Sequence, residues 1–420
     1  MQRRRFMQLG AGLGLGGASL WPVGSHAWAA TAPVQGRDAP RRLVVVFLRG
    51  AVDGLSVVVP YGEPGYRRAR SSIALARPGS EGGVLDLDGR FGLHPALAPL
   101  MPLWQGGRLG FVHASGSPDT TRSHFDAQDY MESGTPGAKS TADGWMSRVL
   151  AGLPGAHETL RAVSVGAVMP RIYAGAQGVS NMPSGAAAAR PTVLDRPRIE
   201  QAFAQLYDGD DRTSRAYRDA QTSRREMHGA LQDEGMDGEM RAANNGAPLP
   251  NGFPADAARL ATLMRRDPHV QLGFIALGGW DTHANQGNAR GQLAARLDPL
   301  GRGLAELASR LGPVFDDTLV VVMSEFGRTV AQNGNGGTDH GHGNVMWLLG
   351  GGVKGGKVHG RWPGLDAAAL YEQRDLAITT DFREVLLQAS ERHLRCGDAQ
   401  LARLFPGYAG PRGSVDVLRG

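Results

Sequence analysis

Carboxylate and imidazole side chains recur beside short apolar runs of this sequence, at the points where buried strands would begin or end. Together they offer the anionic oxygen and neutral nitrogen ligands that divalent cations such as Zn, Mn, Mg or Ca take. We therefore expect a metal site, and the pattern leaves the identity and number of the ions open. The candidate ligands are Asp53, Asp281, His283, Glu325, Asp339, His340 and His342.

Several of these residues also have a simpler interpretation. Asp53 precedes a glycine and could be a turn residue, and Asp281 could be the N-cap of a helix. Glu325 follows a fully apolar run, where a carboxylate serves a site more often than it solvates a surface. The metal hypothesis therefore depends on the whole set.

The histidines of the segment Gly336 to Asn344 have two interpretations as well. His340 and His342 alternate across Gly341, so in an extended chain both imidazoles point the same way. A mobile glycine-rich loop that merely contains histidines is the alternative.

Arginines occupy the same segments and could hold a tetrahedral anion through paired N–H donors. They could equally neutralise the carboxylates. Ser123 leads into the helix-like text SHFDAQDYMES and could be an N-cap or a nucleophile at a helix N-terminus, the N-cap being favoured for Ser123 alone. The candidate catalytic residues are Ser123, Arg122, Arg49 and Arg328.

Short apolar runs between helical patterns predict the elements that must position these residues. A helix over 288–311 is indicated by leucines that step by four and three residues. Alternating strands and helices predict an α/β fold, a doubly wound, mostly parallel sheet sandwiched by helices, whose ligand sites lie at the carboxyl ends of the strands. The expected strands are Arg42–Leu48, Leu109–Ala114, Ala162–Val165, Leu272–Leu277, Thr318–Met323 and Val345–Leu349.

The segment 191–254 differs from this pattern, because it combines charged helical text with a loop-like NNGAPLPNGFP. We expect a helical insertion that lies outside the sheet and could cover the site.

The first 29 residues have the features of a twin-arginine signal peptide. Arginines at positions 3 to 5 precede Phe6 and a glycine-rich apolar stretch, and Ala27-Trp28-Ala29 offers a small-x-small cleavage site. The stretch is too short and too weakly apolar for a stable membrane span, although a retained anchor is the alternative. We expect recognition by the Tat translocon, export to the periplasm or beyond, and a single mature domain over 30–420.

Composition excludes some partners. Removing three arginines and no acidic residue with the signal lowers the formal charge from +5 to +2, and only three of the 45 basic residues are lysines, so no nucleic-acid partner is expected. The single cysteine, Cys396, excludes an intrachain disulfide.

The segments RGAVDGL, TRSHFDAQDYMESG, GGWDTHANQ, SEFGRT and GTDHGHGN, in this order after a twin-arginine signal, resemble the domain-of-unknown-function 1501 (DUF1501) family. That family is in turn similar to the alkaline phosphatase and sulfatase superfamily. The resemblance implies an alkaline-phosphatase-like fold with metals at the strand ends and a nucleophile at a helix start.

Carried over by motif, Asp53 resembles the superfamily's first-strand metal aspartate, and Ser123 lies in the segment of its nucleophile. Asp281 and His283 resemble its paired ligands. Glu325 stands where the superfamily has an Asp-His pair, and His340 or His342 resembles its late histidine. Phe326 replaces the expected histidine, which puts a two-metal centre in doubt, and Asp339 could compensate.

Two functions follow as expectations. The first is an exported metal-dependent hydrolase of phosphate or sulfate esters, in which Ser123 attacks an anionic ester substrate. The second is a non-catalytic exported binding or assembly protein that retains the fold, which the phenylalanine at position 326 favours.

Overall fold

The computed structural model describes residues 40–139, 141–155, 160–185, 240 and 242–419. The expected signal peptide, its expected cleavage site and most of the expected insertion lie outside these residues. Within the described residues, no helix is both long and apolar enough to cross a membrane.

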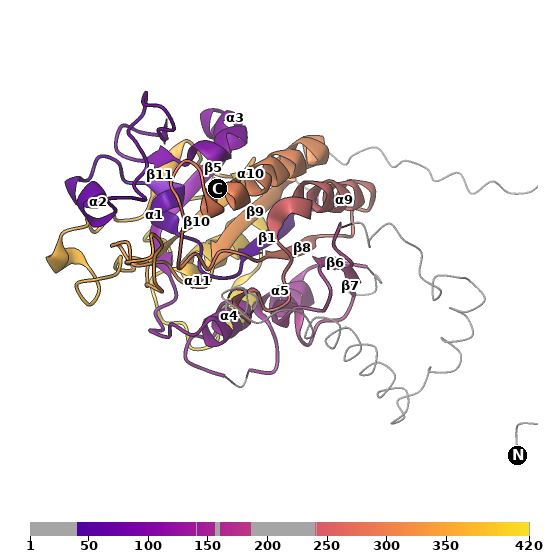
Figure 1. Ribbon diagram of the computed structural model, residues 1–420. Coiled ribbons are helices and arrows are strands. Elements are labelled where there is room, and N and C mark those ends of the chain that lie inside the picture. Colours follow the sequence, from indigo (N-terminus) through magenta and orange to yellow (C-terminus); the bar gives the residue numbers. More distant parts are fainter. Residues whose placement is uncertain (1–39, 140, 156–159, 186–239, 241, 420) are drawn as a thin grey trace, which may run out of the picture. The chain divides into compact units, whose positions relative to one another are not determined.

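Nine strands of the described chain form the central sheet (Figure 1). Its order is β11-β5-β10-β9-β1-β8-β6-β7, and β12 pairs with β5. The pairings are parallel except where β10 lies antiparallel between β9 and β5. The expected mostly parallel α/β sheet is confirmed. The strands are β1 (Arg42–Leu48), β5 (Leu109–Gly116), β6 (Ala162–Val165), β7 (Val179–Met182), β8 (Leu272–Leu277), β9 (Thr318–Ser324), β10 (Asn344–Gly350), β11 (Lys357–His359) and β12 (Thr380–Asp381).

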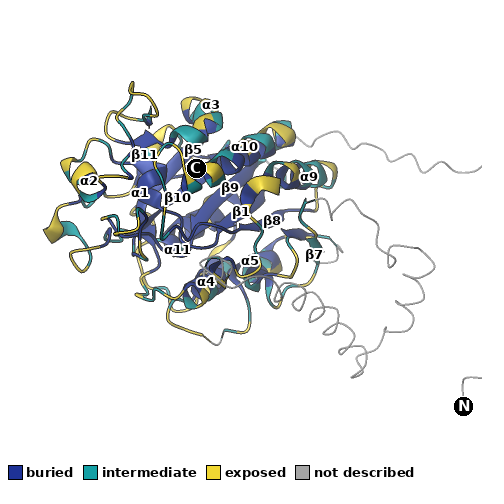
Figure 2. Ribbon diagram, viewed as in Figure 1, coloured by how far each residue is buried: buried dark blue, intermediate teal, exposed yellow. Residues whose placement is uncertain are grey.

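Strand β1 lies in the middle of the sheet and is buried on both faces. Val44, Val46 and Leu48 belong to the core beneath helices α9 (Phe253–Arg266) and α10 (Gln292–Leu311). Leu43, Val45 and Phe47 belong to the core of the opposite face. That face packs against α4 (His124–Ser133), α5 (Trp145–Gly152), α11 (Phe382–Gln388) and α12 (Asp398–Leu404). A continuous apolar run is the pattern that burial on both faces requires, and Figure 2 shows the buried strands between two helical layers.

Helix α10 buries the leucine stripe expected from the sequence. Its leucines from Leu293 to Leu311 pack in the core, and α10 makes extensive contact with α9. Gly303 permits the close approach, because a Cβ there would lie 2.1 Å from the Phe253 ring. The helix starts at Gln292 and not at Asn288, since Gly291 has a φ of +124° that a helix cannot contain.

Smaller elements surround this sandwich. A second sheet has the order β2-β4-β3, with β2 (Val58–Val59), β3 (Leu85–Asp86) and β4 (Gly92–Leu93). The short helices are α1 (Gly54–Val57), α2 (Pro64–Ala69) and α3 (Met101–Gln105).

The direction of β10 determines which loops lie together at the carboxyl edge of the sheet. Because β10 runs antiparallel to β9 and β5, its amino end lies beside their carboxyl ends. The segment that precedes Asn344 therefore joins the loops that follow β1, β5, β8 and β9, at the edge where α/β sheets bind ligands.

Candidate metal centre

Helix α4 presents His124 to the interior from its first turn. Ser123 caps the helix, since its side chain accepts a hydrogen bond from the backbone N–H of Asp126 at 3.5 Å. The N-cap interpretation of Ser123 is thus confirmed. His124 is only 9% exposed.

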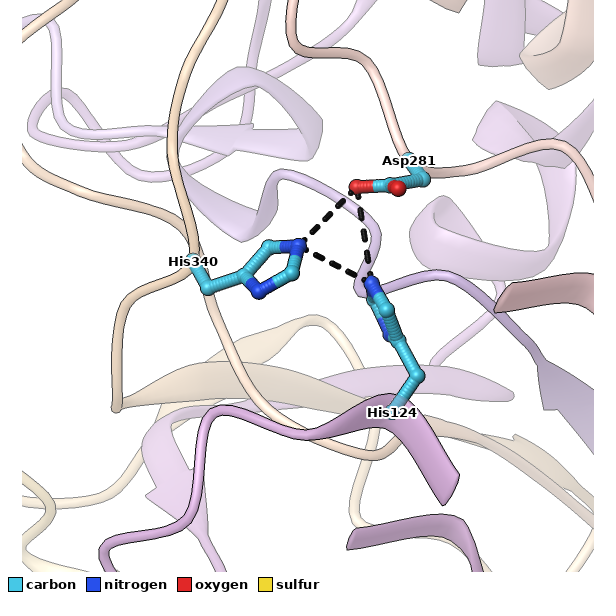
Figure 3. Close-up of side chains that lie close together, drawn as sticks. All are labelled: His124, Asp281 and His340. Carbon is cyan, nitrogen blue, oxygen red and sulfur yellow. Dashed lines mark hydrogen bonds and ion pairs between the residues drawn. The ribbon is translucent and has the colours of Figure 1, made fainter. Parts of the chain in front are cut away.

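Two imidazole nitrogens and one carboxylate oxygen, from His124, His340 and Asp281, converge at the strand edge, and the imidazole of His283 lies beside them. Nε2 of His340 lies 2.9 Å from Nε2 of His124 and 3.0 Å from Nε2 of His283. Oδ1 of Asp281 lies 3.0 Å from Nε2 of His283, 3.2 Å from that of His340 and 3.5 Å from that of His124. Figure 3 shows His124, Asp281 and His340 pointing toward one another from three separate segments.

The outer nitrogen of each of the three rings faces an oxygen. Nδ1 of His124 lies 2.8 Å from Glu325, Nδ1 of His283 lies 3.2 Å from Asp339, and Nδ1 of His340 lies 2.9 Å from the carbonyl oxygen of Arg122. Carboxylate and carbonyl oxygens only accept, so each Nδ1 carries a proton. A neutral ring then has its lone pair on Nε2, whereas a charged ring donates from Nε2 to Asp281. In the neutral form, the lone pairs of His124 and His340 face the same region as the Asp281 oxygen.

Such an arrangement fits a divalent cation. Lone pairs that face one another repel, whereas metal-bound histidines donate their outer N–H to a carboxylate or a backbone carbonyl, as these three do. A set of two imidazole nitrogens and one carboxylate oxygen suits zinc and also other transition metals.

The charges of the centre also favour a cation. Burial alone would raise the pKa of Asp281, but hydrogen bonds from the three histidines and the charge of Arg328 hold it well below its ordinary range. Burial lowers the pKa of His124, but hydrogen bonds to Asp281 and Glu325 outweigh that effect and raise it to about 9. Without a metal ion, His124 therefore binds a second proton at neutral pH, and the positive charge of its ring balances the carboxylates around it.

Arg328 fastens the strand-end loops to one another. It is fully buried, pairs with Asp281, and donates to the carbonyl oxygens of Ala51 at 2.8 Å and Thr338 at 3.0 Å. It also donates to the carbonyl oxygens of Gly50 and Trp280, both at 3.2 Å, and its Nη1 lies 3.5 Å from Nε2 of His283. The structure thus places this arginine as a fixed internal cation.

Glu325 contacts the outer nitrogen of His124, on the side of the ring that faces away from Asp281 and His340. Besides His124, its carboxylate accepts from the backbone N–H of Gly50 at 2.7 Å and from Gln128 at 3.1 Å. Phe326 stacks on the His124 ring at 5.0 Å between centroids. Asp339 similarly contacts only the outer nitrogen of His283 among the three rings. Glu325 and Asp339 thus orient ligands.

Asp53 is engaged elsewhere. Its two oxygens accept from Arg70 at 2.5 and 2.9 Å, and Gln286 donates to it at 2.7 Å. Asp53 and Arg70 are both wholly buried. The structure does not bring Asp53 into the cluster, because the arginine supplies the positive charge that a metal was expected to supply.

The other two arginines also have carboxylate partners. Arg49 is buried and donates to Glu132 at 2.5 Å and to Gln128 at 3.0 Å. Arg122 is partly exposed and contacts Glu372 at 2.6 Å and Asp375 at 3.0 Å.

The two late histidines separate. His340 joins the cluster, whereas His342 stacks on Tyr371 with ring centroids 4.4 Å apart. The expectation that both imidazoles point the same way is wrong, because the chain bends at His342 and is not extended there. The expected approach of His283 to this segment is confirmed by the 4.7 Å between the ring centroids of His283 and His340.

Sequence reasoning did not assign a role to His124. The signal was present, since a histidine at the first turn of a helix after a strand-end loop lies at the ligand edge of an α/β sheet.

Comparison with known proteins assigns the chain to a family but does not give it an activity. The family described as "Protein of unknown function (DUF1501)" matches residues 91–405. No curated protein matches the chain at a significant level.

Three of the solved structures that align with this chain do so at low sequence identity. Ps i-CgsB in complex with k-i-k-neocarrahexaose is 10% identical, with a TM-score of 0.37 over 86% of this chain and 74% of that one. An alkaline phosphatase superfamily protein from Vibrio parahaemolyticus is 10% identical, with a TM-score of 0.34 over 76% of this chain and 62% of that one. The periplasmic domain of EcEptC from Escherichia coli, in complex with Zn, is 12% identical, with a TM-score of 0.35 over 74% and 73%.

Proposed function

This chain belongs to the DUF1501 family, and from that premise we propose that it is an exported metal-dependent hydrolase of phosphate or sulfate esters. The observation that supports the proposal most is the convergence of His124, His340 and Asp281, with the outer ring nitrogens of both histidines bonded to oxygen. These three residues would hold one divalent cation, and His283 lies beside them.

A divalent cation in that position supplies Lewis-acid stabilisation of charge that develops on an ester oxygen. The protein contributes the rest. Glu325, Asp339 and the carbonyl oxygen of Arg122 fix the three imidazoles, and Arg328 holds the Asp281 loop against the neighbouring strand ends.

Ser123 is the proposed nucleophile. Its hydroxyl is exposed at the N-terminus of α4 and directly precedes the proposed ligand His124. The positive end of the ten-residue helix favours an anionic group at this place.

Turnover assays test the catalytic part. The full chain is loaded with Zn, Mn, Mg or Ca and assayed with aryl phosphates, phosphodiesters and aryl sulfates. Ser123→Gly removes the hydroxyl at a stability cost of only a few tenths of a kcal/mol, because glycine is tolerated at N-caps. Turnover that disappears in this variant supports the nucleophile, and unchanged turnover contradicts it.

Export is the second part of the proposal and rests on the twin-arginine pattern of residues 1–29. N-terminal sequencing of the protein from the periplasm should find a mature chain that begins near Ala30. Recovery of Met1 on the exported protein contradicts cleavage.

A non-catalytic exported binding or assembly protein is the second candidate. Two observations favour it: Arg49 and Arg328 have buried partners within the described chain, and Phe326 fills the space beside His124 and His340. Stoichiometric metal with no turnover on any ester, and no effect of Ser123→Gly on the phenotype, would support this candidate.

A further inference from the structure

Two arginines share one buried carboxylate beside the proposed metal ligand His340. Asp375 is wholly buried and accepts from Arg122 at 3.0 Å and from Arg374 at 2.9 Å through each of its oxygens. The guanidinium groups themselves remain partly exposed, at 36% for the Arg122 side chain and 42% for that of Arg374. Asp375 thus fixes two cations that still face solvent.

Both arginines contact His340 directly. The carbonyl oxygen of Arg122 accepts from Nδ1 of His340 at 2.9 Å, and Arg374 donates to the carbonyl oxygen of His340 at 2.7 Å. Arg122 thus meets His340 through its own backbone, and the Arg374 guanidinium meets the backbone of His340.

Arg122 keeps unused donors. Its two bonds, to Glu372 and Asp375, both come from Nη2. A guanidinium carries five N–H donors in a planar fork that matches the oxygens of a phosphate or sulfate group. Its other nitrogens have no partner among the residues that the structure describes and could bind a tetrahedral anion.

Glu372 already places an anionic group on Arg122. Its side chain is 52% exposed and lies 2.6 Å from Nη2 of Arg122. It sits in a tight turn in which Glu372 and Gln373 both have positive φ, of +51° and +54°. That left-handed conformation is unfavourable for such residues and is associated with functional sites.

We propose that Arg122 and Arg374 form a subsite for a tetrahedral oxyanion, phosphate or sulfate, beside His340, and that Glu372 occupies it until the ligand displaces the carboxylate. The subsite deepens the proposed hydrolase and rests on it for its role, because the ester substrate would place an anionic group there. Glu372 would then disfavour weakly anionic ligands, which compete poorly with a tethered carboxylate.

Binding of inorganic phosphate and inorganic sulfate to the full chain tests the subsite, measured by calorimetry on both chelator-treated and zinc-loaded protein. Arg122→Gln should weaken binding about tenfold or more, since a charge-assisted hydrogen bond contributes roughly 1.5–3 kcal/mol. Glu372→Gln should tighten anion binding about two- to fivefold, because the anion no longer has to break an exposed ion pair between Glu372 and Arg122. The anion whose binding responds to these substitutions, phosphate or sulfate, is the one that the subsite prefers.

Arg302→Gln is the matched control, since Arg302 is an exposed arginine on α10 that pairs with Asp298 at 2.6 Å. It should leave anion binding unchanged. If the chain takes up no metal but the effects of Arg122→Gln and Glu372→Gln persist, the subsite stands and the metal centre fails. If metal binds and anion affinity is equal in wild type and both variants, the subsite is overturned. Because Glu372 is exposed, its variant tests the subsite even if Arg122→Gln unfolds.

Discussion

Glu325 and His124 are 201 residues apart in sequence, yet the carboxylate lies 2.8 Å from Nδ1 of the imidazole. This contact turns Nε2 of His124 toward His340 and Asp281. The acid that follows β9 therefore acts on the centre through the first residue of α4.

Replacing Glu325 by glutamine should weaken metal binding about 10- to 100-fold, the usual effect of removing an outer-shell carboxylate. The fold should persist, because the amide retains the shape and can still accept from His124. Competition with a chromogenic chelator measures the affinity. Glu384→Gln is the control, since Glu384 is a buried carboxylate of α11 bonded to Ser414. An affinity equal to that of the wild type would contradict the orienting role.

Chelation should destabilise the wild type, because a ligand bound only by the native state stabilises it by about 2.7 kcal/mol at a free concentration 100 times its Kd. Thermal unfolding with and without a chelator measures the difference. His340→Ala should abolish the chelator effect. His342→Ala should retain it, because that ring stacks on Tyr371 and lies outside the cluster. The opposite pattern would assign the ligand to His342.

The chelated protein should lose stability as the pH rises. The pKa of His124 is about 9 in the folded chain, above its ordinary value of about 6.5. Its contribution is therefore fully present below about pH 6.5 and lost as the pH passes through about 9. Metal replaces the proton, so the difference in Tm between loaded and chelated protein should widen over this range. His124→Gln should flatten the pH dependence, and an unchanged slope in that variant would contradict the assignment.

Arg70→Met should destabilise the fold by roughly 3–5 kcal/mol, the cost of leaving a buried charge without its partner. Asp53 is that partner and is wholly buried. Urea unfolding measures the free energy of unfolding of the variant. Adding Asp53→Asn to Arg70→Met should recover part of the lost stability, because it removes the carboxylate that has lost its partner. Metal content should stay at that of the wild type, since neither residue belongs to the cluster. A loss of metal in the folded double variant would show that Asp53 is a ligand.

The sheet could be predicted well from the sequence, because strands buried on both faces leave uninterrupted apolar runs. The bounds of β1, β6 and β8 agree with those expected. The direction of β10 could not be predicted, since an apolar run of five residues, VMWLL, has the same pattern in either orientation. That direction is nevertheless what brings His340 to the carboxyl edge.

The candidate site could be predicted only in part. Asp281, His283 and His340 were expected near one another and are. The pairing of Asp53 with Arg70 depends on how the chain after α2 folds back under the strand end, and no spacing encodes it. The separation of His340 from His342 depends on a bend that glycine permits but does not require.

The position of β1 also has a consequence for synthesis of the chain. This strand is made before both of its neighbours, β8 and β9, which come more than 220 residues later in the chain. At about 5–20 residues per second, β1 waits roughly 10 to 60 seconds for its hydrogen-bonding partners. During that time seven consecutive residues, RLVVVFL, present unpaired backbone and apolar side chains, which is the composition of an aggregation-prone segment. The nascent protein should therefore depend on chaperone protection of its amino-terminal strand until about three quarters of the chain has been translated.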